Sequence, residues 1–202
     1  SPGLASCRRR PLSSNVRPRT EMPRFVVLLR GVNVGKGNRV PMAEFKALLE
    51  GLAYTNVSTI LNSGNAVFTS SGRSPTKHAA AIATTLQQKL GVSAPVIVKS
   101  AAELSAIIGA SPITPPDADH SRYFVAFAAE EEALLALTPL QALAQAPQRF
   151  VVSSAAAFLH CPNGILESKV GEALLGKAGK GVTTRNWATV LKLHALALST
   201  GA

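Results

Sequence analysis

The chain lacks the features that mark membrane, disulfide-rich and zinc-binding proteins. Its longest apolar runs, FVVLL and YFVAFAA, are far shorter than the ~20 residues that cross a bilayer. Its two cysteines, Cys7 and Cys161, are too far apart in sequence to suggest a disulfide framework. No CxxC or HxxxH spacing is present, so no metal site is predicted. The cysteine usage therefore agrees with a reducing compartment.

Recognisable catalytic and cofactor motifs are also missing. The sequence contains no GxxxxGK[ST] loop, no GxGxxG fingerprint and no GxSxG elbow, and no cofactor is predicted. His194 falls on the apolar stripe of the last predicted helix, which is typical of a core histidine. His160 ends a predicted strand and Cys161 follows it directly, so their side chains point to opposite faces, which argues against a catalytic pair. Aromatic residues make up only 5% of the chain, which argues against sequence-specific RNA recognition by stacking.

Acidic residues are scarce, but the resulting charge of +10 is unevenly distributed. Five arginines against Glu21 place +4 of it in residues 1–21, SPGLASCRRRPLSSNVRPRTE. This segment has no apolar stretch, which excludes a secretory signal, and its composition predicts a disordered basic extension. Met22 offers a simple start for the folded chain, although an organelle transit peptide would have a similar composition. The remaining charge is spread out and gives little support for nucleic-acid binding.

The first part of the chain reads as a ferredoxin-like βαββαβ unit over residues 22–109. A buried strand is predicted at 24–30, followed by a helix with apolar residues at i, i+3, i+4 and i+7. Two short strands, 57–61 and 66–69, flank a polar turn. A capped helix and a fourth strand complete the unit, and Ser100 with Glu103 forms a capping box for one more helix.

The second part repeats much of this order in an α+β pattern over residues 122–202. Residues 110–121, ASPITPPDADHS, are rich in proline and form the predicted linker. Strands are predicted at 123–128, 149–152 and 156–160. A helix is predicted to open with the acidic residues 130–132, and further helices are predicted at 168–178 and 186–198. The second half is therefore a βαββα-type unit with an added C-terminal helix.

A basic, glycine-rich loop follows the first strand and is the first candidate binding site. In RGVNVGKGNR, glycines let the backbone approach a ligand, and cationic side chains favour an anion. The candidate ligand-binding residues are Arg30, Asn33, Lys36 and Arg39. The alternative is that the glycines only shape a turn and the cations are solvated.

The turn between the second and third strands is a weaker candidate. Asn62, Ser63 and Asn65 carry donors and acceptors there, and Asn65 is included in the predicted site. In a simple ferredoxin-like unit we expect this turn at the sheet end opposite the basic loop. The two segments would then not be neighbours, which favours a purely structural turn.

A third candidate precedes the last helix, where Thr183, Thr184, Arg185 and Asn186 combine capping groups with a cation. Free N–H groups and the helix dipole favour an anion at such a point. Thr184, Arg185 and Asn186 are therefore predicted to bind the ligand. The alternative is a capped helix whose Trp187 is packed in the core.

Three separated segments resemble the DUF1697 family, a bacterial domain of unknown function. They are LLRGVNVGKGNRVPM, LNSGNAVF and TTRNWATVLKL, and the resemblance spans Met22 to Leu198. It implies a cytoplasmic bacterial-type α+β protein with ferredoxin-like elements, without known catalytic residues. Family members normally begin just before the first strand, so the basic extension departs from the pattern.

Three functions are compatible with these observations. The leading hypothesis is a binding module for a phosphorylated small molecule, a nucleotide or a nucleic-acid backbone. The second is an enzyme that uses the same surface with Glu44 or Glu167 as a base. The third is an interaction module or homodimer that uses its sheet as the contact surface.

Overall fold

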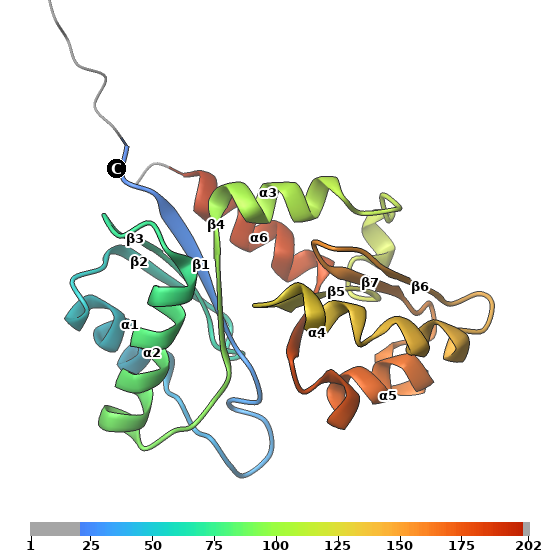
Figure 1. Cartoon of the computed structure of the whole chain (residues 1–202), viewed down its shortest axis with the longest axis horizontal. Helices are drawn as coiled ribbons and strands as arrows, with labels where there is room; N and C mark the ends of the chain where they lie inside the picture. The colour runs from blue at the N-terminus through green and yellow to red at the C-terminus, as the bar shows by residue number, and fades with distance from the viewer. Residues whose placement is uncertain (1–20, 200–202) are drawn as a thin grey trace, which may run out of the picture.

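Two four-stranded antiparallel sheets, each with its own helices, make up the protein (Figure 1). The computed structural model describes residues 21–199, so the predicted extension, apart from Glu21, lies outside the described residues. Within residues 21–199, no helix is both long enough and apolar enough to span a bilayer. The α+β fold class is confirmed.

The first half has the predicted ferredoxin-like order. Its elements are β1 (Arg24–Leu29), α1 (Met42–Gly51), β2 (Thr55–Ile60), β3 (Asn65–Thr69), α2 (Pro75–Leu90) and β4 (Val96–Ser100). The strand order is β2-β3-β1-β4, with every neighbouring pair antiparallel. Alternate β1 residues face opposite sides, and Phe25, Val27 and Leu29 pack with residues of α1 and α2 in an outer core.

The second half has the same topology and one strand more than the sequence predicts. Its elements are β5 (Tyr123–Ala128), α4 (Glu131–Leu135), β6 (Arg149–Val152), β7 (Ala157–His160), α5 (Lys169–Leu175) and β8 (Val182–Asn186). Four 3-10 helices lie between elements: η1 (Asp117–Asp119), η2 (Thr138–Leu143), η3 (Ile165–Glu167) and η4 (Lys177–Gly179). The strand order is β6-β7-β5-β8, so each half is a complete βαββαβ unit.

Strand β8 corrects the prediction that Thr183 to Asn186 only lead into a helix. Val125 pairs with Arg185 and Phe127 pairs with Thr183 across the β5–β8 ladder. The segment forms a strand because Val182, Thr183 and Thr184 are β-branched and complete the sheet beside β5. The predicted helix 168–178 is correspondingly shorter and ends at Leu175.

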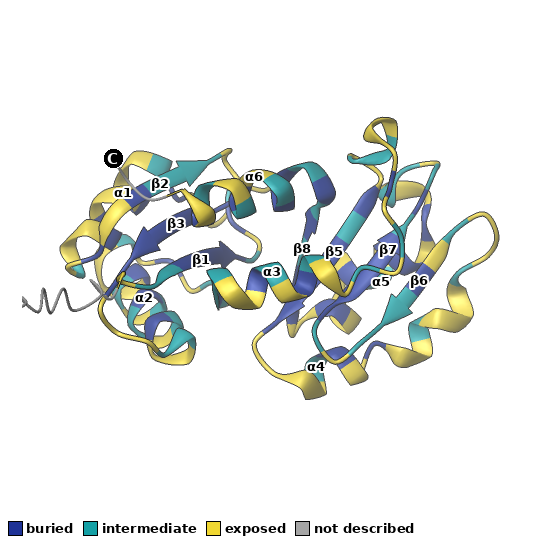
Figure 2. Cartoon of the chain, turned by 90° about the horizontal axis from the view of Figure 1, so that it is seen from above, coloured by how far each residue is buried: buried dark blue, intermediate teal, exposed yellow. Residues whose placement is uncertain are grey.

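Two helices, α3 (Ala101–Gly109) and α6 (Trp187–Leu198), follow the last strand of each half and lie side by side between the sheets (Figure 1). Ser100 and Glu103 form the predicted capping box at α3, and Asn186 caps α6 by accepting from the Thr189 N–H. The helices contribute to a central core shared by both sheets, built from Val26, Leu28, Leu104, Ile107, Val125, Phe127, Trp187, Val190 and Leu193. Figure 2 shows buried strands on both sides of α6 and exposed outer faces on the helices. The alternative for Trp187, a core position, is confirmed.

Both faces of each sheet are therefore covered. The outer face of the first sheet packs against α1 and α2, and the inner face of each sheet belongs to the central core. A third core joins the outer face of the second sheet to Leu134 of α4 and to Val170 and Leu174 of α5. A homodimer that buries an open sheet face has no such face available among residues 21–199.

The position of the β2–β3 turn corrects a second prediction. Strands β1 and β2 are parallel because both pair antiparallel with β3. Asn65, the first residue of β3, lies opposite both Leu28 near the end of β1 and Ile60 at the end of β2. The basic loop and the turn therefore leave from the same end of the sheet, not from opposite ends. We call residues 30–41 and 61–64 together the first-half corner.

Candidate functional site

A close backbone contact holds the 61–64 turn against the end of β1, where the basic loop begins. The N–H of Leu29 donates to the carbonyl of Gly64 at 3.0 Å. Gly64 has φ of 75°, and a Cβ there would lie 2.7 Å from Leu29 Cβ and 2.8 Å from Val32 Cγ2. Only glycine fits this position without a shift, because it tolerates positive φ and has no side chain.

Asn33 fastens the basic loop instead of facing a ligand. Its Nδ2 donates to the carbonyls of Val40 at 2.8 Å and Asn62 at 2.7 Å, and its Oδ1 accepts from the Val40 N–H at 2.8 Å. These bonds use the donors and the acceptor of its amide. Asn33 was a candidate ligand-binding residue, but the structure gives its amide a structural role in the loop.

Arg185 reaches from β8 into the first-half corner and binds both halves. Its Nε donates to Asn65 Oδ1 at 2.6 Å, and one terminal nitrogen donates to the carbonyls of Leu29 at 2.6 Å and Ser63 at 3.0 Å. The other donates to Thr183 Oγ1 at 2.7 Å and to the Thr184 carbonyl at 2.9 Å. All five N–H groups are therefore used by neutral oxygen atoms of the protein. Arg185 has no donor left for a ligand, which revises its predicted role as a direct anion ligand.

Asn65 is the partner of Arg185 and is fully buried. Besides accepting from Arg185, it donates through Nδ2 to the Ile60 carbonyl at 3.3 Å. The predicted ligand contact of Asn65 is thus also replaced by a structural one.

The charge of Arg185 is buried without a carboxylate. Its exposed fraction is 9%, and burial lowers its pKa to about 10, so it stays charged near neutral pH. The salt bridges within the described part of the chain are formed by other residues. Neutral acceptors do not cancel the positive charge of the Arg185 guanidinium. Its electrostatic field therefore extends into any adjacent space of low polarity.

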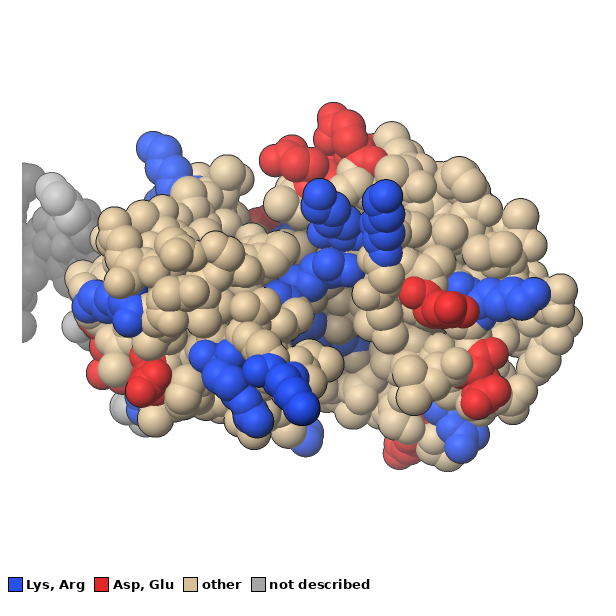
Figure 3. Space-filling view, turned by 90° about the horizontal axis from the view of Figure 1, so that it is seen from below, with Lys and Arg blue, Asp and Glu red and all other residues tan. Residues whose placement is uncertain are grey.

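Such a space lies beside Arg185, between the two halves. A cleft of about 500 Å³ is lined by the end of β1, the first-half corner, the end of α5, β8 and the start of α6. No Asp, Glu, His or Cys belongs to its lining, as far as residues 21–199 are concerned. In Figure 3, Lys and Arg side chains gather around the hollow between the halves. A cleft of this volume suits a small-molecule ligand.

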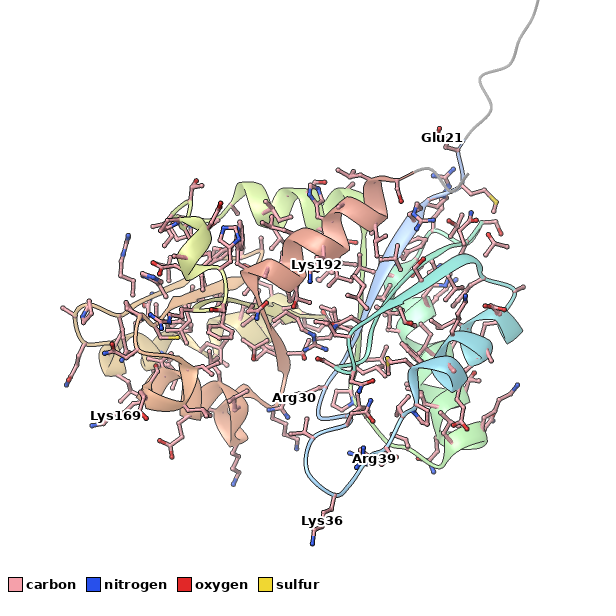
Figure 4. The ribbon with its side chains drawn as sticks, turned by 180° about the vertical axis from the view of Figure 1, so that it is seen from behind. Glu21, Arg30, Lys36, Arg39, Lys169 and Lys192 are labelled. Carbon is pink, nitrogen blue, oxygen red and sulfur yellow. The ribbon has the colours of Figure 1, made fainter. Side chains whose placement is uncertain are left out.

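Arg30 spans this cleft and has free donors. One of its terminal nitrogens donates to the carbonyl of Gly176, just after α5, at 3.2 Å. The other N–H groups of this half-buried guanidinium have no acceptor in the described residues, in contrast to Arg185. Figure 4 shows Arg30 at the junction of the halves, with Lys36 extending away from the tip of the loop.

Half of the predicted site residues line the cleft. Arg30, Thr184, Arg185 and Asn186 do so, together with Ser63 and Thr189. Lys36 and Arg39 are exposed on the loop and do not line it, and Asn33 and Asn65 support its walls from behind. Sequence reasoning missed the aliphatic lining from Val34, Leu61, Leu174 and Leu175. The signal for it was a leucine in a turn otherwise built of Asn, Ser and Gly.

The catalytic candidates lie elsewhere. Glu44 and Glu167 are exposed and do not line the cleft. His194 is half-buried and forms a 2.8 Å hydrogen bond with Ser105 between α3 and α6. His160 contacts Asp119 at 3.2 Å, whereas Cys161 packs into the outer core of the second half, where burial raises its pKa to about 11. No cluster of metal-ligating side chains occurs in the part of the chain that the structure describes.

The family model described as "Protein of unknown function (DUF1697)" matches residues 22–158. The chain belongs to the DUF1697 family. The match includes the first-half corner and ends in β7, so TTRNWATVLKL remains a resemblance beyond the matched range. No curated protein matches this DUF1697 protein.

A solved structure similar to this DUF1697 protein is that of a conserved bacterial protein from Streptococcus pneumoniae. The TM-score is 0.71 at 22% sequence identity, and the alignment covers 87% of this chain and 99% of that chain. At this identity, the similarity establishes the fold.

Proposed function

We propose that this DUF1697 protein binds a small phosphorylated anion in the cleft between its two halves. The observation that carries the proposal is the guanidinium of Arg185, which lies in the cleft wall without a carboxylate partner. A buried cation that hydrogen bonds only to neutral groups favours a negative ligand nearby. A wall free of Asp and Glu in the described residues strengthens this preference.

Three kinds of group that face the cleft can each contribute to phosphate binding. Arg30 has free N–H donors and can bind two phosphate oxygens at once. The hydroxyl groups of Ser63, Thr184 and Thr189 lie among the lining residues and can donate to the remaining oxygens. The positive end of the α6 dipole adds to the potential, because Asn186 at the start of α6 also lines the cleft.

A compact ligand fits these observations better than a nucleic-acid backbone. The cationic groups Arg30 and Arg185 both line one concave space, whereas Lys36 and Arg39 are exposed outside it. A backbone-binding surface would instead need cations along an extended track. The cleft also lacks a carboxylate, imidazole or thiol within residues 21–199 that could act as a general base, which favours binding over catalysis.

Titration with inorganic phosphate, methyl phosphate and pyrophosphate, followed by amide chemical shifts, tests the proposal. We expect shifts at Gly31, Ser63 and Thr184, and binding that weakens as the salt concentration rises. Arg30→Gln should weaken binding of methyl phosphate about tenfold, because a charge-assisted hydrogen bond is removed.

Arg73→Gln provides the matched control. Arg73 is exposed and follows β3, at the sheet end opposite the first-half corner. The same loss of charge there should leave the affinity unchanged. Equal effects of the two substitutions, or no binding of any phosphate, would refute the proposed function.

A further inference from the structure

The rim of the cleft carries exposed aliphatic side chains next to its cationic wall. Val34 is 71% exposed, Leu61 54% and Leu175 55%. They are three of the eight large hydrophobic side chains that are exposed in the described residues, and all three line this cleft. Single exposed apolar residues are ordinary, but their convergence on one cleft indicates an apolar part of a ligand.

Leu61 is the most informative of the three because its backbone is unfavourable for leucine. Its φ is 57°, a left-handed conformation that Gly, Asn and Asp adopt far more easily. Asn62, Ser63 and Gly64 in the same turn have the usual turn chemistry, so a polar residue at 61 would suit the fold better. A strained and exposed leucine at the mouth of a cleft is explained by contact with a ligand.

The lining also restricts the chemistry of the apolar part. Val32 and Leu174 continue the aliphatic surface inward from Leu61 and Leu175. No Phe, Tyr or Trp lines the cleft, within the described chain, so a nucleobase would find no stacking partner.

From these observations we infer that the ligand is an amphipathic phosphate, with an aliphatic chain against Leu61 and Leu175 and its phosphate at Arg30. This inference rests on the proposed function and narrows it from phosphorylated molecules in general to soluble single-chain alkyl or acyl phosphates. Nucleotides are thereby disfavoured as ligands.

Calorimetric titration with methyl phosphate, hexyl phosphate and AMP tests the inference. A half-buried methylene strengthens binding about twofold, so the five extra methylenes of hexyl phosphate should tighten binding about thirtyfold over methyl phosphate. Leu61→Asn should lower the hexyl-to-methyl affinity ratio at least about threefold while leaving methyl phosphate binding unchanged. The variant should fold well, because Asn accepts positive φ.

Leu166→Asn is the matched control, because Leu166 is 85% exposed and lies outside the cleft lining. It should leave the affinity ratio unchanged. Sedimentation with phosphatidylcholine vesicles that contain phosphatidic acid separates a soluble ligand from a membrane lipid. Vesicle binding that depends on Leu61, without a chain-length effect in solution, overturns the inference.

The remaining outcomes separate this inference from the proposed function. If methyl phosphate binds and hexyl phosphate binds no tighter, or if AMP binds tighter than hexyl phosphate, the inference fails and the proposed function stands. If no phosphate binds, both fail. A thirtyfold preference for hexyl phosphate that Leu61→Asn reduces and Leu166→Asn does not establishes the amphipathic ligand.

Discussion

The two halves share one topology but differ at the connection that leaves their first strand. In the first half, twelve residues join β1 to α1, whereas two residues join β5 to α4 in the second. Strand-to-helix connections usually take two to six residues. The second half therefore shows that this topology forms with a short connection, so the fold itself does not require the additional residues of the first half.

The charges at these two places also have opposite signs. The long connection contains Arg30, Lys36 and Arg39, whereas the short one contains Glu130 and leads into Glu131 and Glu132 at the start of α4. Yet the second half contributes to the first-half corner through Arg185. The comparison indicates that the first half supplies the loop. The second half supplies the buried cation, Arg185, which hydrogen bonds to residues on both sides of the loop's base and turn and adds positive charge to the cleft.

Replacing Arg185 tests this contribution of the second half, and it is the substitution with the largest expected effect on stability. Arg185→Met should lower the free energy of unfolding by about 3–5 kcal/mol, because it leaves the buried oxygens of Leu29 and Asn65 without this donor and also removes the hydrogen bond to the Ser63 carbonyl. Urea denaturation followed by circular dichroism measures the change. Arg149→Met, an exposed arginine on β6 of the same sheet, is the control and should change stability by less than about 0.5 kcal/mol. Similar losses for both variants would mean that the shared core alone joins the halves.

The sequence predicted the first half well because its patterns are local. The apolar run of β1, the capped α2 and the Ser100–Glu103 capping box all depend on residues within a few positions of one another. Strand β8 was missed because Thr183, Thr184 and Asn186 have the chemistry of helix caps, and only their pairing with β5 shows them to be a strand.

The candidate site was predicted in part, for a related reason. Sequence motifs located Arg30, Thr184 and Asn186 in segments that do line the cleft. They could not show that the donors of Arg185 are used by acceptors 120 and 156 positions away, at Asn65 and Leu29. Nor could composition show that Leu61 lines the cleft, since that depends on how the halves pack.

A second substitution tests whether side-chain hydrogen bonds hold the long connection of the first half in its conformation. Asn33 and Asn38 both have positive φ in this loop, but Asn33 makes three hydrogen bonds through its side chain, whereas Asn38 makes one at 3.4 Å. Asn33→Ala should therefore lower the free energy of unfolding by about 2 kcal/mol more than Asn38→Ala. Because both variants place alanine at positive φ, the difference isolates the hydrogen bonds. Equal losses in urea denaturation would indicate a loop that is shaped by its glycines alone.

The smallest expected effect concerns Cys161, which belongs to the outer core of the second half. Burial raises its pKa from 9.0 to about 11, so above pH 9 the unfolded chain loses this proton before the folded protein does. Stability must then fall with rising pH across this window, by about 1 kcal/mol at pH 10. Urea denaturation under reducing conditions at pH 8 and pH 10 measures this loss of stability. In Cys161→Ala the loss between the two pH values should be smaller by about 1 kcal/mol, independently of the variant's stability at pH 8. An unchanged pH dependence would mean that the thiol ionises as easily in the folded protein as in the unfolded chain, and that the second half is more open at this point than its packing indicates.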